Sequence, residues 1–185
     1  MPPTFLDVVT DCFLEATTKI SPIYFQLPVM GIEVPKFLER VYCYELYHQM
    51  RMLWPNVPYQ LTGEVDKSGH PRIRQGVLNR SKPDFTIHVP GNMDANLLVI
   101  EVKARDPVDQ NVVRDLEKLT AFCISAGYDA AYYLIYGFSS NEVSRFAARC
   151  VQLARTNAAT VDLAKITLFN QTSPMTKASK IAWPS

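Results

Sequence analysis

The sequence lacks a long apolar run and has almost no net charge. Its first basic residue is Lys19, and no uncharged apolar run approaches about 18 residues, so we expect neither a secretory signal nor a membrane span. An intracellular, cytoplasmic protein is therefore expected. The formal net charge of +1 does not indicate a polyanion partner for the molecule as a whole. Any affinity for nucleic acid would have to come from a local patch.

The signatures of several enzyme classes are also missing. The four cysteines are widely spaced, with no Cys-x-x-Cys pair and no neighbouring His, so neither a zinc site nor a redox pair is indicated. No GxxxxGK[ST], GxSxG or HExxH occurs, so nothing supports a nucleotide-triphosphatase, a serine hydrolase or a zinc protease.

A chain of 185 residues, 48% of them hydrophobic, can bury one sizeable core, and we expect a single domain, 1–185. Apolar spacing predicts an amphipathic helix over 4–20 and another over 35–54. Strands are predicted at 57–65, on both sides of residue 90, at 130–138 and within 160–169. Helices are predicted between Asp106 and Gly127 and over 141–157, the latter opened by a capping box of Ser139 and Glu142. This order indicates an α/β fold around a mixed sheet.

One stretch of the sequence begins and ends with charged residues and is largely apolar between them: KPDFTIHVPGNMDANLLVIEVK, residues 82–103. Strand alternation puts Glu101 and Lys103 on one face, and Asp84 on the polar face of the preceding strand. If Val89 paired directly with Leu97, Asp84 would lie opposite Val102, whose side chain is on the other face of its strand from Glu101 and Lys103. We therefore predict a one-residue shift or a bulge that sets Asp84 opposite Glu101 or Lys103.

Two carboxylates and an ammonium at the end of a hairpin suit a hard divalent cation. Mg²⁺ takes oxygen ligands and keeps several waters, so one or two carboxylates, a backbone carbonyl and a substrate phosphate are enough. The metal can polarise a phosphoryl oxygen and activate water, and a nearby ammonium can orient that water. The residues thus predict phosphodiester hydrolysis with Mg²⁺, for which Mn²⁺ can substitute.

Pro83-Asp84, followed by Glu101-Val102-Lys103 at the end of a hydrophobic strand, resembles the PD-(D/E)xK nuclease superfamily. The resemblance implies a restriction-endonuclease-like mixed sheet flanked by helices, with core order αβββαβ over residues 35–138. The N-terminal helix and extended connection (1–34), a C-terminal helix and strand (139–169) and a tail (170–185) lie outside this core.

The resemblance also implies roles for individual residues. Asp84, Glu101 and the Val102 carbonyl would be metal ligands, and Lys103 would position the attacking water. Many members add a Glu from the helix before the sheet, for which Glu45 is the candidate, because it borders the core-facing stripe of that helix. Glu39 is expected to face solvent, since Lys36 and Arg40 flank it. Some exonuclease branches carry Gln and Tyr four residues apart in the next helix, whereas here Gln110 is followed by Arg114.

A basic segment, KSGHPRIRQGVLNRSK, lies directly before Asp84. Its position favours contact with DNA phosphates, although such runs are often solvated loops. The candidate DNA-binding residues are Lys67, Arg72, Arg74, Arg80 and Lys82. DNA is the expected partner, and a homodimer or a larger nuclease assembly is compatible with so small a chain.

Other interpretations stay open at the level of sequence. The first is a catalytically inactive nuclease-like module for DNA binding or protein interaction instead of an endonuclease. A second is a phosphohydrolase for a small phosphate ester, which a closed pocket would favour. A third treats Glu101 and Lys103 as a cross-strand ion pair on a solvated sheet face.

Overall fold

The computed structural model describes residues 2–63, 78, 82–92 and 94–184 of the chain. Its helices are α1 (Phe5–Thr17), α2 (Pro22–Phe25), α3 (Glu39–Met52), α4 (Asp109–Ser125) and α5 (Ser140–Thr156), with a 3₁₀ turn, η2 (Leu163–Lys165). Its strands are β1 (Gln60–Gly63), β2 (Phe85–His88), β3 (Asn96–Ala104), β4 (Tyr128–Tyr136), β5 (Ile166–Gln171) and β6 (Ser179–Ile181).

The six strands form a mixed sheet in the order β1-β2-β3-β4-β5-β6. The central strands β3, β4 and β5 run parallel, and β1, β2 and β6 pair antiparallel with their neighbours. Because parallel neighbours need a crossover, α4 connects β3 to β4 and α5 connects β4 to β5. The chain is therefore an α/β protein, as the sequence predicts.

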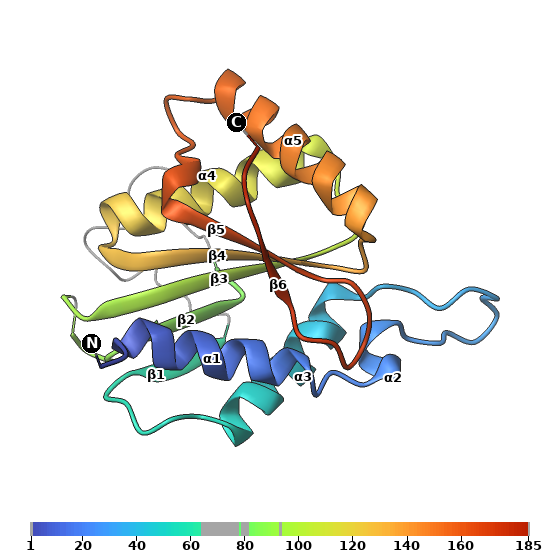
Figure 1. The fold of residues 1–185 in the computed structure, drawn as a ribbon, viewed down its shortest axis with the longest axis horizontal. Coiled ribbons are helices and arrows are strands. Elements are labelled where there is room, and N and C mark those ends of the chain that lie inside the picture. The colour runs from blue at the N-terminus through green and yellow to red at the C-terminus, as the bar shows by residue number, and fades with distance from the viewer. Residues whose placement is uncertain (1, 64–77, 79–81, 93, 185) are drawn as a thin grey trace.

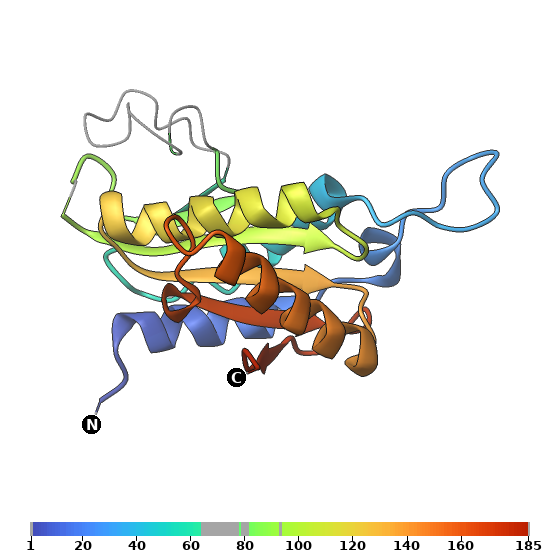
Figure 2. The same cartoon turned by 90° about the horizontal axis from the view of Figure 1, so that it is seen from above.

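Helices cover both faces of the sheet (Figure 1). On β4, Tyr132, Leu134 and Tyr136 pack in the apolar layer under α1 and α3, whereas Tyr133 and Ile135 pack in the layer under α4 and α5. Burial on both faces explains why β4 is a nearly continuous apolar run rather than an alternating one. Figure 2, seen from above, looks through α4 and α5 onto the central strands and shows the loop closed by the Leu27–Lys36 bridge projecting from the body.

Helix α1 buries its apolar stripe on the chain's own sheet. Val9, Phe13 and Ala16 have no exposed surface, and the Phe13 ring packs edge-on against Phe169 with ring centres 5.4 Å apart. A capping box between Thr4 and Asp7 begins the helix. The N-terminal helix thus caps the domain's core.

Most predicted elements are present with shorter or shifted ends. The helix predicted over 35–54 is α3, and the run predicted as a strand over 130–138 is β4, which starts two residues earlier. Among the described residues, the order from α3 to β4 is helix, three strands, helix, strand, as predicted. The segment predicted as a tail instead contributes β6, and Trp183 Nε1 donates to the Ile166 carbonyl at 2.8 Å.

The predicted register shift between β2 and β3 is present. Ile87 pairs with Leu98, but the next residue, His88, pairs with Asn96, so Leu97 is the extra residue of a bulge. Because of this shift, paired side chains of β2 and β3 face the same side of the sheet along the stretch that leads to Asp84 and Glu101.

Within the described ranges, no helix combines the length and low charge that crossing a membrane would need.

Candidate functional site

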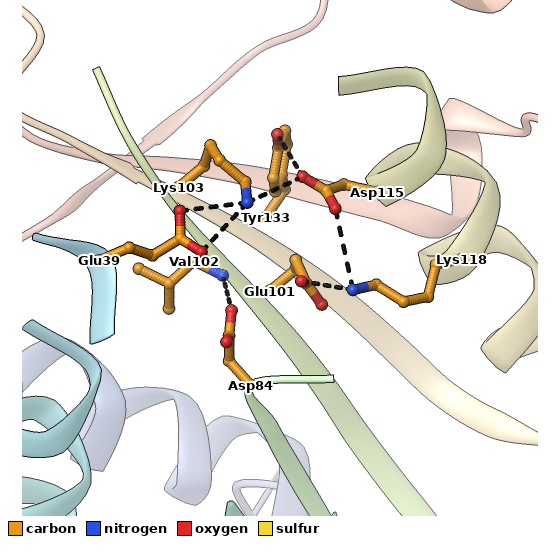
Figure 3. Close-up of polar contacts among 8 residues, drawn as sticks. All are labelled: Glu39, Asp84, Glu101, Val102, Lys103, Asp115, Lys118 and Tyr133. Atoms are coloured by element: carbon orange, nitrogen blue, oxygen red, sulfur yellow. Dashed lines mark hydrogen bonds and ion pairs between the residues drawn. The ribbon is translucent and has the colours of Figure 1, made fainter. Parts of the chain in front are cut away.

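Two strand ends bring Asp84 beside Glu101. Phe85 pairs with Ile100, so continuing the antiparallel register by one residue sets Asp84 opposite Glu101. The Val102 amide donates to Asp84 Oδ2 at 2.7 Å, which fixes the carboxylate against β3 (Figure 3). The hairpin therefore gathers the two acids that the sequence analysis names.

Helix α4 supplies two more charged side chains from above β3. Lys118 Nζ lies 2.5 Å from Glu101 Oε1 and 3.8 Å from Asp115 Oδ1. Tyr133, on the neighbouring strand β4, donates its hydroxyl to Asp115 Oδ2 at 3.3 Å. Asp115 and Lys118 are one helical turn apart, so both point from α4 toward the sheet (Figure 3).

Lys103 is held between two carboxylates. Its Nζ lies 3.1 Å and 3.2 Å from the two oxygens of Glu39, and 3.3 Å from Asp115 Oδ2. Only 17% of the Lys103 side chain is exposed. Burial alone would lower the pKa of this ammonium, but Asp115 and Glu39 outweigh it and raise the pKa above its ordinary value. Lys103 is therefore a charged hydrogen-bond donor near neutral pH.

A close packing contact positions the start of α3, and with it Glu39. The Phe37 ring packs edge-on against Tyr136 and Phe25. Gly137 has a φ of 84°, and a Cβ there would lie 2.5 Å from the Phe37 ring, so only glycine permits this approach. Glu39 follows Phe37 by two residues at the first turn of the helix.

Six residues form what we call the charged cluster: Glu39, Asp84, Glu101, Lys103, Asp115 and Lys118. Its four carboxylates and two ammonium groups leave a formal excess of two negative charges. Burial raises the pKa of Asp84 to about 6, against a partly compensating hydrogen bond from Val102. Burial, and then the charge of Asp84, raise the pKa of Glu101 well above its ordinary value. The cluster is thus short of positive charge on its Asp84–Glu101 side.

The oxygen atoms on that side fit a divalent cation held largely by water and substrate. Glu101 Oε2 is buried and has no hydrogen-bond partner among the described residues. The same residues contain no group of three or more His, Cys, Asp or Glu side chains set to enclose a metal ion. Mg²⁺ does not need such a cage, because one or two carboxylates with waters and a phosphate complete its shell. The donor set available is the Glu101 and Asp84 carboxylates.

Of the predicted metal-site residues, Asp84, Glu101, Val102 and Lys103 lie together, whereas Glu45 pairs within its own helix. Glu45 Oε1 accepts from Gln49 Nε2 at 2.7 Å, and no hydrogen bond or ion pair among the described residues joins it to the charged cluster. The acid of α3 that does reach the cluster is Glu39. The expectation that Glu39 faces solvent is therefore wrong: its flanking basic residues are exposed, but its own side chain turns toward Lys103.

Asp115 and Lys118 were missed by the sequence analysis. Both interrupt the apolar stripe of α4 that contains Val112, Leu116 and Leu119. An acid and a base one turn apart on a core-facing stripe, in the helix directly after a strand ending in Glu-x-Lys, is the signal that could have identified them.

The predicted DNA-binding residues fall mainly outside the described residues. This applies to Lys67, Arg72, Arg74 and Arg80. Lys82 is described and exposed, two residues before Asp84.

The interpretation of Glu101 and Lys103 as an ion pair on a solvated face is wrong. Glu101 is 4% exposed, because α4 covers this part of the sheet. Its ion-pair partner is Lys118, and the partners of Lys103 are Glu39 and Asp115. The pairs thus run between layers, in a setting where unpaired charge is costly.

Comparison with protein-family models and with curated proteins found no match to this chain. Any function assigned to it therefore depends on the chemistry of its own residues.

Proposed function

We propose that the chain is a metal-dependent nuclease that hydrolyses DNA phosphodiester bonds with Mg²⁺ or Mn²⁺. The observation that carries the proposal is the pairing of Asp84 with Glu101 beside Lys103, with a buried Glu101 oxygen that has no partner among the described residues. The order of elements from α3 to β4 and the Pro-Asp and Glu-x-Lys motifs support membership of the PD-(D/E)xK superfamily, with its restriction-endonuclease-like fold.

Each residue has a role that follows from its surroundings. Asp84 and Glu101 hold the metal, which when bound would polarise a phosphoryl oxygen of the substrate. The Val102 carbonyl, between Glu101 and Lys103, is the backbone ligand in this proposal. The Val102 amide keeps Asp84 oriented so that its second oxygen remains available.

Lys103 acts on the attacking water as a donor rather than as a base. Its raised pKa keeps it charged, so it can orient a water and stabilise developing negative charge but does not remove a proton. Glu39 and Asp115 hold its ammonium from two sides. They are positioning residues, because they act through Lys103.

The test is cleavage of supercoiled, linear and single-stranded DNA with Mg²⁺ or Mn²⁺. The parent should nick the covalently closed circle, which identifies an endonuclease, and EDTA should abolish nicking. Asp84→Ala and Lys103→Ala should each lower the rate by about a hundred-fold or more. Circular dichroism of each variant checks that the loss is not unfolding.

A matched pair of variants on α3 tests the arrangement of the site. Glu39→Gln removes a carboxylate that contacts Lys103, whereas Glu45→Gln removes one that pairs with Gln49. We expect Glu39→Gln to slow cleavage and Glu45→Gln to leave it near the parent rate. The reverse result would restore Glu45 as the helix carboxylate of the site.

A second candidate function is a catalytically inactive nuclease-like module that binds DNA or protein. The contact that favours it is Lys118 Nζ at 2.5 Å from Glu101, because an ammonium there offsets the carboxylate charge without a metal. This candidate predicts that the folded parent cuts none of the three substrates, and that binding is equal in EDTA and Mg²⁺ and unchanged by Asp84→Ala.

A further inference from the structure

A cavity of about 370 Å³ lies beside Asp84, between α3 and the ends of β1 and β2 that lead to the site. The described residues that line it are Cys43, Tyr44, Tyr47, Gly63, Asp84 and Phe85. Small-ligand sites in proteins span about 300–1,000 Å³, so the cavity can accept a group the size of a small ring system.

Half of the described lining residues are aromatic. Tyr44 and Tyr47 are one turn apart on α3 and so share a face of the helix. The Tyr47 ring is close to parallel with Phe85, at 20° and 6.3 Å between ring centres. Tyr44 leaves 65% of its surface exposed, whereas Tyr42, on the core face of the same helix, is fully buried against Tyr136. Tyr44 is therefore not used in packing the core.

The rest of the lining adds little polarity. Burial, together with the charge of Asp84, raises the pKa of the Cys43 thiol well above its ordinary value, so the thiol stays neutral. Gly63 adds no side chain, and a Cβ there would sit 3.5 Å from the Asp84 carbonyl oxygen and 3.9 Å from the Phe85 and Tyr47 rings. Asp84 is the one charged side chain among the described lining residues. The cavity thus suits a flat, uncharged group attached to something held at Asp84.

We infer that this cavity receives one unpaired nucleobase of the strand whose phosphate is held at Asp84 and Glu101, which makes single-stranded or locally unpaired DNA the preferred substrate. The inference rests on the proposed function, because it takes the Asp84–Glu101 side of the charged cluster as the phosphate position. Asp84 belongs to both the cavity and the charged cluster. A base in the cavity can therefore have its own phosphate, or that of a neighbouring nucleotide, at the cluster.

An intact duplex cannot place a base in this cavity unless that base is first unpaired and extruded. In a duplex each base face is covered by its neighbours, and extruding a base costs a few kcal/mol. An unpaired base has free faces and stacks on aromatic side chains regardless of sequence. The exposed Tyr44 ring is available for such stacking, so unpaired DNA gains contacts that intact duplex does not.

The experiment measures stacking directly. A short single strand and the matching duplex, each carrying 2-aminopurine, are titrated with protein in Ca²⁺, and a denaturing gel checks that strands stay intact. Binding of the single strand by the parent should quench 2-aminopurine fluorescence. Tyr44→Ala should lose the quenching and weaken single-strand binding by about five- to a hundred-fold, with little change for the duplex. Gly63→Val, which fills the cavity without removing a ring, should do the same.

Two controls separate stacking from loss of structure. Tyr44→Phe keeps the ring and should retain the quenching and most of the affinity. Tyr24→Ala removes an exposed tyrosine on α2, away from the cavity, and should match the parent. Equal weakening of single-strand and duplex binding by Tyr44→Ala would overturn the inference, as would unchanged quenching in both Tyr44→Ala and Gly63→Val.

Cleavage assays of the same proteins distinguish this inference from the proposed function. If the parent shows Tyr44-dependent quenching but cuts no DNA in Mg²⁺ or Mn²⁺, the nuclease proposal fails and the base site stands. If the parent cuts DNA and Tyr44→Ala neither loses affinity nor changes its preference for single strands, the base site fails and the nuclease proposal stands.

Discussion

Asp84 and Glu101 carry negative charge at a place where burial disfavours it. Burial raises the pKa of both carboxyls, and the charge of Asp84 raises that of Glu101 further, although Lys118 pairs with Glu101. Among the described residues, neither acid forms an ion pair with Lys103. Such an arrangement costs stability in the absence of a cation. In the proposed nuclease, a bound divalent cation would remove this cost.

Replacement of Asp84 by Asn should therefore stabilise the metal-free protein at neutral pH. The folded pKa of Asp84, about 6, exceeds its ordinary value of 3.8. The associated stability is fully present below pH 3.8 and is lost as the pH rises through about 6. A shift of this size corresponds to roughly 2–3 kcal/mol, so Asp84→Asn should exceed the parent by about that amount at pH 8 in EDTA and match it near pH 4.

Urea unfolding of both proteins from pH 4 to pH 8 measures this difference. The contrast between parent and variant reports the loss of the Asp84 charge, including its effect on Glu101, whose pKa that charge raises. A variant that is less stable than the parent at pH 8 in EDTA would show that Asp84 is stabilised in the fold rather than strained.

Removal of Lys118 should cost far more than its removal together with the Glu101 charge. Lys118→Met leaves a buried carboxylate without its ammonium, and losing one partner of such a pair typically costs about 3–5 kcal/mol. The double variant Lys118→Met, Glu101→Gln leaves no unpaired charge and should recover most of that loss. Urea unfolding in EDTA, as a double-mutant cycle, gives the coupling; additive losses would mean that the pair is not linked in the folded protein.

Strand alternation made the strand residues of the site predictable, whereas the residues that the helices contribute could not be predicted from the helix pattern. Glu101 and Lys103 had to share a face, and only a shifted register could bring Asp84 to them. For α3, rotation about the helix alone does not say which acid meets the sheet, because that depends on how Phe37 packs against Gly137. Asp115 could not be predicted without knowing that α4 lies over the strand that carries Lys103.

At the level of elements, local signals predicted helix α5 well. Ser139 and Glu142 bond each other's backbone N–H groups, with Ser139 N to Glu142 Oε2 at 2.8 Å. β6 gave no such signal, since three residues of an edge strand are defined by the partner strand β5 rather than by their own pattern. Short elements of this kind depend on tertiary contacts.

The α5 cap should contribute a measurable part of stability. Ser139→Ala removes the acceptor for the Glu142 amide, and loss of such a cap costs about 1 kcal/mol. Ser144→Ala is the matched control within the same helix, because the serine hydroxyl bonds the Ser140 carbonyl of its own helix and alanine is the better helix former. Urea unfolding should show a loss for the first variant and none for the second. Equal stability of both variants would mean that the cap is not needed to start α5.

Over the whole molecule, the two ends of the chain depend on each other. The C-terminal segment lies against the end of α1, where Met175 N donates to the Ile20 carbonyl at 2.9 Å. Gln171 Nε2 donates to the Thr17 carbonyl at 2.8 Å, and the Ala178 amide donates to Thr17 Oγ1 at 2.9 Å. The two Thr17 contacts are buried, so they connect α1 to β5 and β6 as one cooperative unit.

Thr17→Val tests this connection with almost no change of shape. The Ala178 amide would lose its acceptor inside the protein, which costs about 1–3 kcal/mol. Thr18→Val is the control, because among the described residues its hydroxyl bonds only Glu15, at the surface. Since the two ends are coupled, hydrogen exchange in Thr17→Val should accelerate together in α1 and in residues 171–181. Acceleration confined to the C-terminal segment would show that α1 is held by its packing on Phe169 and Tyr132 alone, and that the sheet edge can open without it.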